Sequence, residues 1–218
     1  CFGATICVSD DEVPTVKGRL INDMDEAHSL KIPSVGSGRT QLYIDAIKNA
    51  KGEYIAFLDA DDIWMEDKLE KELAFMQEKQ AAFVFTAYEF GDENAVGTGK
   101  IVKVPDTLTY KKALSRTIIF TSTTMFDLSI LGKDMVKMPA APREDTATWW
   151  NILRHGYTAY GLDENLVLYR RSAGTLSFNK LEAIRRIWYL YRQVEGLGFV
   201  YSVYNFVFYA VRAVLRRV

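Results

Sequence analysis

Three carboxylates directly follow a short apolar run in the chain, at Asp59, Asp61 and Asp62. The preceding residues, 54–58, have the composition of a buried strand. Side chains two positions apart on a strand point to the same side, so Asp59 and Asp61 can face one ion. Clustered carboxylates repel one another unless a cation lies between them, and hard divalent cations take oxygen ligands that they share with phosphates. The pattern predicts a site for a divalent cation and a diphosphate, whereas Asp62 fits the N-cap of the following helix.

Two further segments place polar side chains after expected strands. Asp10 follows the apolar residues 4–8. Arg170 ends an expected strand at residues 166–170, and Arg171 begins the polar loop behind it. Ligands of open α/β sheets bind at the carboxyl ends of strands, so these side chains are candidates for the same site. Arginine suits a diphosphate because its guanidinium donates two hydrogen bonds at once, although a solvated turn is the alternative.

Asp145 opens an expected helix that contains Trp149 and Trp150. A carboxylate at this position is commonly a helix cap, and a general base is the alternative. The two tryptophans are expected in the core, although aromatic rings also line sugar sites. These alternatives remain open at the level of sequence.

The elements that must position these residues alternate between strand and helix. This alternation predicts an α/β fold with a mostly parallel sheet and helices on both faces. We expect strands at 4–8, 30–35, 52–58, 81–90, 118–126 and 166–170, and helices at 13–29, 40–50, 65–79 and 108–114 and around 148–153.

The end of the chain differs in composition, and we divide the chain into residues 1–180 and a basic, aromatic helical tail at 181–218. The apolar stretch at 197–211 is shorter than the about 20 residues that a membrane span needs. Tyrosine and tryptophan with flanking arginine are typical of a helix that lies on an anionic membrane surface. Packing against the rest of the chain or in a dimer is the alternative.

The composition narrows the class of protein. The chain has 218 residues, of which 49% are hydrophobic, and this is enough for one sizeable core. A formal net charge of −1 argues against nucleic-acid binding. Two cysteines give no disulfide framework, so the cytoplasm is the expected compartment. The chain lacks an initiator methionine, so we expect it to be a fragment.

Four segments together resemble the inverting GT-A glycosyltransferases of family 2, which use nucleotide-sugar donors: residues 49–64, 121–125, 143–149 and 169–180. The tail, with residues 191–195, is similar to that of bacterial members that build cell-wall or capsular polysaccharides, including teichuronic-acid-type enzymes. Such proteins normally begin with an apolar strand that has no counterpart here. We therefore expect an N-terminally incomplete or divergent GT-A domain.

The resemblance implies transfer of a sugar, with inversion, from a UDP-sugar to a saccharide or lipid-linked acceptor in bacterial surface polysaccharide synthesis. It implies a cytoplasmic protein that is peripheral on the inner face of the cell membrane and uses Mn²⁺ or Mg²⁺. The alternative is a non-catalytic GT-A-like binding protein. The roles carried over are nucleotide binding for Asp10, ribose and metal for Asp59, metal for Asp61, general base for Asp145, and diphosphate for Arg170 and Arg171.

Overall fold

The computed structural model describes residues 4–8, 15–16, 19–20, 27–31, 47–59, 62–170 and 180–215. Its strands are β1 (Ala4–Val8), β2 (Thr15–Val16), β3 (Arg19–Leu20), β4 (Ala27–Lys31), β5 (Tyr54–Leu58), β6 (Ile63–Trp64), β7 (Phe83–Gly91), β8 (Gly97–Val102), β9 (Thr107–Leu108), β10 (Thr124–Asp127) and β11 (Ala159–Arg170). Its α-helices are α2 (Lys68–Lys79), α3 (Tyr110–Leu114), α4 (Leu128–Val136), α5 (Glu144–Arg154), α6 (Lys180–Tyr189) and α7 (Phe199–Leu215). A 3₁₀ turn, η2, covers Thr121–Thr123, and a π-helical turn, η4, covers Leu190–Val194.

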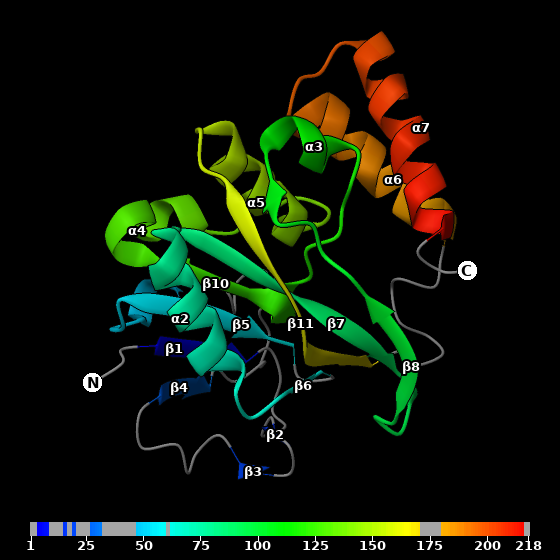
Figure 1. The fold of residues 1–218 in the computed structure, drawn as a ribbon. Helices are drawn as coiled ribbons and strands as arrows, with labels where there is room; N and C mark the ends of the chain where they lie inside the picture. Colours follow the sequence, from blue (N-terminus) through cyan, green and yellow to red (C-terminus); the bar gives the residue numbers. More distant parts are fainter. Residues whose placement is uncertain are drawn as a thin grey trace.

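These strands form one sheet in the order β3-β2-β6-β11-β7-β10-β5-β1-β4, with β8 beside β7 and β9 beside β11 (Figure 1). β1 is parallel to β4 and β5, and β11 is parallel to β7. β10 is antiparallel to both β5 and β7. β5 and β7 therefore point the same way, and the carboxyl ends of the main strands meet at one edge of the sheet.

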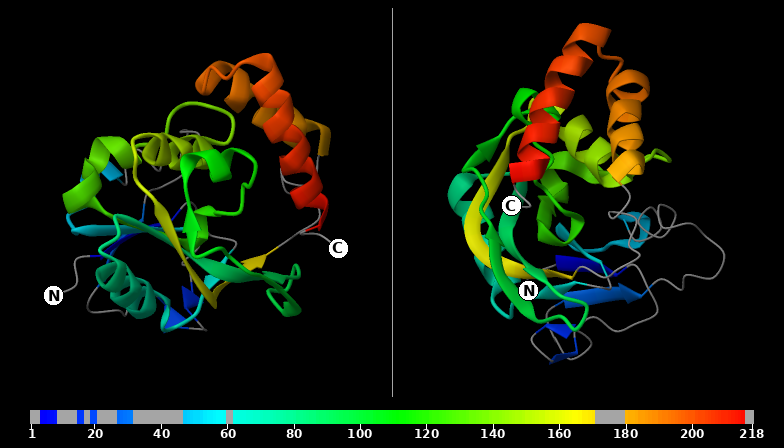
Figure 2. Two further views of the ribbon diagram at one scale, coloured as in Figure 1. Left: turned by 45° about the horizontal axis from the view of Figure 1, so that its top comes forward. Right: turned by 90° about the vertical axis from the view of Figure 1, so that its right-hand side faces the viewer.

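Helices cover both faces of this sheet. α2 lies against one face, over β7 and β11, and α4 and α5 lie against the other (Figure 2). The α/β fold class predicted from the sequence is thus confirmed, although the sheet is mixed rather than mostly parallel.

An aromatic cluster joins α5 to the sheet. Trp149 stacks on Phe126 with ring centroids 5.0 Å apart, and it also contacts Phe83 at 5.6 Å and Phe57 at 6.3 Å. All four side chains are buried. Burial of large aromatic rings supplies much of the packing energy of a core, so Trp149 is a core residue rather than part of a sugar site.

Several expected elements differ from the structure. The helix expected at 13–29 is wrong, because residues 15–16 and 19–20 form the β2–β3 hairpin and residues 27–31 form β4. Val16 pairs with Trp64 of β6, so pairing with distant residues overrides the local pattern. The helix expected from residue 65 begins at Lys68 because residues 63–64 pair with β11.

Other boundaries also shift. Only residues 124–127 of the strand expected at 118–126 are extended, after the η2 turn. β11 is much longer than the strand expected at 166–170, and α4 was not expected. Of the helix expected at 40–50, residues 47–49 are helical and 40–46 lie outside the described residues, as does the loop expected at 171–179.

The tail helices α6 and α7 lie against one end of the domain (Figure 1). Tyr191 stacks on Trp150 with centroids 5.4 Å apart, and its hydroxyl donates to the carbonyl of Leu114. Burial raises the pKa of the Tyr191 hydroxyl above its ordinary value. None of the helices in the described part of the chain is long and apolar enough to cross a membrane. The tail therefore shares the core of the domain, and the division at residue 180 stays a prediction.

Candidate active site at the carboxyl end of β5

Asp59 lies directly after β5, whose residues Ile55, Ala56, Phe57 and Leu58 are fully buried. The aspartate itself is 8% exposed. Its backbone N–H donates to the hydroxyl oxygen of Ser122, at 3.0 Å. The candidate donor-side acid is therefore held at the carboxyl edge of the sheet by a bond to a residue 63 positions away.

Asp62 is not the helix cap that the sequence suggested, because α2 begins at Lys68 with Asp67 at the N-cap position. Its carboxylate instead accepts the hydroxyl of Ser122 at 2.5 Å and the backbone N–H of Arg170 at 3.1 Å. Only 2% of the residue is exposed. Both carboxylate oxygens of Asp62 thus bind protein donors, which suits positioning rather than metal binding.

Ser122 is the residue that the sequence reasoning missed, although the segment 121–125 was singled out. It accepts from the Asp59 N–H, donates to Asp62, and its carbonyl accepts the indole N–H of Trp64 at 2.7 Å. Because β10 is antiparallel to β5, its amino end, and hence Ser122, lies at the carboxyl edge of β5. We call the contacts among Asp62, Ser122 and Arg170 the three-segment junction.

A buried ion pair lies behind Trp64. The ammonium of Lys68 is 4.3 Å from the ring centroid of Trp64 and pairs with the carboxylate of Glu72. Both charged side chains are fully buried. Burial raises the pKa of Glu72 to about 7 and lowers the pKa of Lys68, while each partner opposes the other's shift.

Asp145 lies in the first turn of α5, half-buried, and one of its carboxylate oxygens accepts the Thr146 N–H at 2.6 Å. The chain turns after α5 and enters β11, where Tyr160 pairs with Val84 near the start of β7. The end of α5 therefore lies near the amino edge of the sheet, and its start is directed toward the carboxyl edge, where Asp59 also lies. The positive end of the helix dipole favours a carboxylate there.

Asp10, Asp61 and Arg171 lie outside the described residues. β1, the strand before Asp10, pairs in register with β5, and Val8 lies opposite Leu58. The strands that precede Asp10 and Asp59 thus end side by side. Arg170 is half-buried at the end of β11.

One candidate metal ligand, Asp59, lies among the described residues. No group of three His, Cys, Asp or Glu side chains within them is placed to hold an ion. Asp59 offers carboxylate oxygens of the kind that Mn²⁺ and Mg²⁺ prefer, whereas Asp62 is already engaged. The carboxylate of Asp59 is therefore of a kind that fits a hard divalent cation.

Comparison with known proteins decides the family. Residues 33–131 match the family described as Glycosyl transferase family 2. The chain is 42% identical over 182 residues to the putative teichuronic acid biosynthesis glycosyltransferase TuaG of Bacillus subtilis, covering 83% of this chain and 71% of that protein. The chain belongs to glycosyl transferase family 2.

One further relative and one solved structure are also similar to this chain. A β-1,3-glucosyltransferase of Escherichia coli, WfgD, named for UDP-Glc and α-D-GlcNAc-diphosphoundecaprenol, is 29% identical and is matched over 82% of this chain and 70% of its own length. A mannosyltransferase of Pyrobaculum calidifontis, solved with GDP-Man and Mn²⁺, superposes with a TM-score of 0.63 at 15% identity. That match covers 89% of this chain and 64% of the other, and it shows a shared fold.

Proposed function

We propose that this family 2 chain transfers a sugar from a nucleotide-diphosphate donor, a UDP-sugar, to a saccharide or lipid-linked saccharide, with inversion, in bacterial surface polysaccharide synthesis. The three-segment junction is the observation that carries the proposal. It joins the segment of Asp59 and Asp62 to Ser122 and to the end of β11 at the edge toward which Asp145 points. The name of WfgD supports a UDP-sugar donor and a lipid-linked acceptor, and TuaG is named for teichuronic acid biosynthesis.

On the donor side, Asp59 and Asp61 would hold Mn²⁺ or Mg²⁺, and Asp10 would contact the nucleotide base. Arg170 and Arg171 would bind the diphosphate, because arginine is suited to paired oxygens. A bound cation supplies Lewis-acid stabilisation of the charge that develops on the leaving diphosphate. The Mn²⁺ complex of the mannosyltransferase with the same fold supports this assignment.

On the acceptor side, Asp145 acts as general base. An acceptor hydroxyl is a weak nucleophile, so a carboxylate within hydrogen-bond reach takes its proton as the attack develops. The oxygen attacks the anomeric carbon from the side opposite the diphosphate, and the bond to the diphosphate breaks as the new bond forms. One displacement inverts the anomeric centre without a covalent intermediate.

The tail would hold the protein at its acceptor. α7 exposes apolar side chains to solvent, including Val200, Tyr204 and Val207, and α6 carries Arg185 and Arg186. Such a surface suits association with an anionic membrane, and the proposed location is the cytoplasmic face of the cell membrane.

The donor assignment is tested by titration calorimetry of UDP with and without Mn²⁺. We expect binding that depends on the metal. Absence of such binding would favour the alternative, a GT-A-like protein that binds partners without transfer.

The base assignment is tested by Asp145→Asn. We expect loss of transfer by at least about 100-fold, because general-base catalysis contributes at least that much, with the affinity for UDP nearly unchanged. Glu144→Gln, the same change one residue earlier on α5, is the matched control and should retain transfer. An active Asp145→Asn enzyme would refute the assignment.

A further inference from the structure

The tail contacts both ends of α5, the helix that carries the candidate base. At the start of the helix, Nη1 of Arg143 donates a hydrogen bond to the hydroxyl of Tyr209 in α7, at 3.4 Å. At its end, Nη1 of Arg154 donates to the carboxylate of Glu195, the residue that follows η4, at 3.3 Å. The tail therefore holds α5 by a polar contact at each end.

The start of α5 has an unusual backbone conformation. Arg143, at the N-cap position, has φ of 60° and ψ of 57°, in the left-handed region that residues other than glycine rarely adopt. Such a conformation costs free energy and persists only where the surrounding structure holds it. Because Asp145 follows two residues later, the backbone of Arg143 sets where its carboxylate lies. The contact with Tyr209 thus bears directly on the candidate base.

The end of α5 contacts a carboxylate that is costly to bury. The side chain of Glu195 is 1% exposed. One of its oxygens accepts both the guanidinium of Arg154 and the hydroxyl of Tyr110 in α3, the latter at 2.5 Å. The other oxygen has no hydrogen-bond partner among the described residues. An unpaired oxygen of a buried carboxylate destabilises the fold, so stability alone does not account for a glutamate here.

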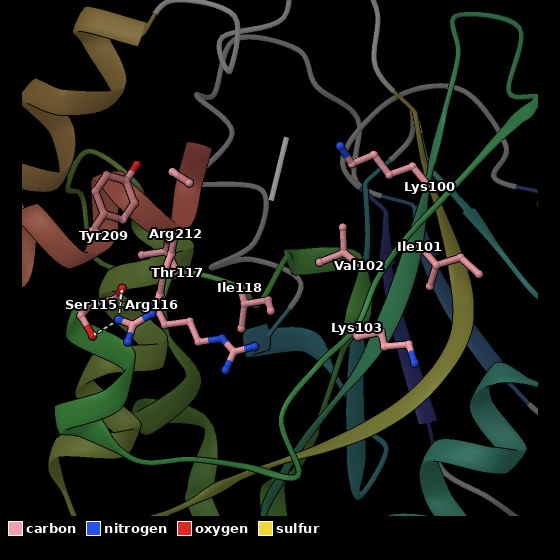
Figure 3. Close-up of a pocket in the computed structure, with 11 residues that line it drawn as sticks. Lys100, Ile101, Val102, Lys103, Ser115, Arg116, Thr117, Ile118, Tyr209 and Arg212 are labelled. Carbon is pink, nitrogen blue, oxygen red and sulfur yellow. Dashed lines mark hydrogen bonds between the residues drawn. The ribbon is translucent and has the colours of Figure 1, made fainter. Parts of the chain in front are cut away.

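Further contacts fix the tail against α3, which packs on α5. Arg212 of α7 donates to the carbonyl oxygen and the hydroxyl of Ser115, directly after α3, at 2.9 and 2.6 Å (Figure 3). Tyr209 precedes Arg212 by three residues on the same helix, so this contact helps to fix the Tyr209 hydroxyl. Tyr191 stacks on Trp150 in the middle of α5 and donates to the end of α3. The tail and α3 thus form a fixed frame around α5.

We propose that the tail positions the general base, with Tyr209 and Glu195 as positioning residues that act through the two ends of α5. The inference rests on the proposed transferase function, in which Asp145 is the base. Both residues act through the helix rather than through a contact with the substrate. A displacement of about 1 Å at a catalytic group costs up to about 100-fold in rate, so a fixed helix matters for proton transfer.

Steady-state release of UDP tests the inference, with UDP-glucose and UDP-N-acetylglucosamine as donors, Mn²⁺ present and water as the acceptor. Water must lose a proton to the base just as an acceptor hydroxyl does. We expect Tyr209→Phe and Glu195→Gln each to lower kcat roughly tenfold or more. The KM for the donor and the affinity for UDP should stay unchanged, because the loss falls on the transition state alone.

Tyr189→Phe and Glu78→Gln are the matched controls. Tyr189 is an exposed tyrosine of α6, and Glu78 is an exposed glutamate of α2 that pairs with Lys79. Both variants should have the kcat of the wild type. Tail contacts with a merely structural role would lower the free energy of unfolding but leave the kcat of the folded enzyme unchanged in Tyr209→Phe and Glu195→Gln, and that result would overturn the proposal.

Combination with Asp145→Asn shows whether the effect passes through the base. In that background, Tyr209→Phe should lower the residual rate no further, because residues that act as a unit are strongly non-additive. An equal loss in the two backgrounds would mean that Tyr209 acts elsewhere, contrary to the proposal.

Amide hydrogen exchange, which needs no activity, separates this inference from the proposed function. The Ala147 amide donates to the Arg143 carbonyl and the His155 amide to the Asn151 carbonyl, so they report on the start and the end of α5. We expect faster exchange of the first in Tyr209→Phe and of the second in Glu195→Gln. This result without UDP release by the wild type would sink the function but leave the positioning of α5 standing. Unchanged exchange and kcat in both variants, with turnover lost in Asp145→Asn, would refute the inference alone.

Discussion

Neighbouring aspartates of one motif have different surroundings in this chain. The Asp59 carboxylate lies at the strand end and is a candidate ligand, while the Asp62 carboxylate is occupied by Ser122 and by the backbone of Arg170. An interpretation that assigns all three aspartates, 59, 61 and 62, as metal ligands would therefore predict too many ligands. Asp62 instead fixes the end of β11, whose last residue is Arg170.

Ser122→Ala tests how much the contacts of Ser122 with Asp59 and Asp62 contribute to stability. The change leaves the buried Asp59 N–H without its acceptor and Asp62 without one donor. We expect a loss of about 2–4 kcal/mol in the free energy of unfolding, because each buried polar group left unpaired costs about 1–3 kcal/mol. Urea denaturation measures it, and UDP affinity in Mn²⁺ should fall as well.

Thr98→Ala is the control, since this hydroxyl donates to the Phe90 carbonyl from an exposed position on β8. Its effect should stay below about 1 kcal/mol, within the range for surface changes and a single neutral hydrogen bond. Equal losses in the two variants would mean that the junction has no special role.

The elements predicted well from sequence are those with long, self-consistent patterns. β5, β7 and α2 each combine buried apolar residues with enough length to be identified locally. The strands β2, β3 and β6 are each two residues long. Pairing between distant segments, such as Val16 with Trp64, stabilises them, so the local sequence does not predict them. α4 did carry a signal: Asp127 caps it, accepting from the Ser129 N–H at 2.8 Å.

The site follows the same rule. The candidates Asp59, Asp145 and Arg170 came from residue types at element ends, whose placement the topology of an α/β sheet fixes. Ser122 could not be found this way, because a serine in a threonine-rich segment has no distinguishing chemistry until Asp62 is beside it. Contacts across 60 and 108 positions are properties of the fold.

The buried pair of Lys68 and Glu72 gives a test at the element scale. Glu72→Leu should destabilise the chain by about 3–5 kcal/mol, because it leaves a buried ammonium without its partner. The double change Lys68→Met with Glu72→Leu should be close to neutral, or stabilising. Urea denaturation distinguishes them, and similar losses in the two would contradict this account of the pair.

The same ion pair predicts that the free energy of unfolding depends on pH. Glu72 has a folded-state pKa raised from 4.5 to about 7, so the folded state holds the proton more tightly. Its contribution to stability is present below pH 4.5 and is lost as the pH rises through about 7. Lys68 has a lowered pKa and acts in the opposite sense, raising stability between that pKa and 10.5.

Stability measured against pH for the wild type minus the double variant isolates these two groups. The difference should fall between pH 4.5 and about 7 and rise toward pH 10.5. A difference that is flat over both windows would show that neither group is shifted.

At the scale of the whole molecule, the tail has two faces. One face is part of the core, through buried Ile187, Leu190 and Tyr191, and the other exposes apolar residues of α7. Exposed positions 200, 203, 204, 207 and 211 recur at helical spacing, so they form one stripe. The two alternatives left open by the sequence, packing on the domain and contact with a membrane, are compatible.

Flotation with anionic liposomes tests the stripe. We expect the wild type to co-float and Val200→Glu with Val207→Glu to remain at the bottom of the gradient, because charge opposes burial in the acyl region. Val96→Glu, an equally exposed apolar position in the turn before β8, is the control and should float. Failure of the wild type to co-float would remove the membrane assignment.

The three-segment junction also bears on how the chain folds. Arg170 reaches Asp62 across 108 positions, and Ser122 reaches it across 60. Contacts between residues so far apart in the chain are expected to form late in folding, because closing a long loop costs conformational entropy before the contact stabilises the chain. Competence for the donor should therefore emerge in the last stage of refolding, and a ligand that binds only the closed state should slow unfolding and raise the melting temperature together.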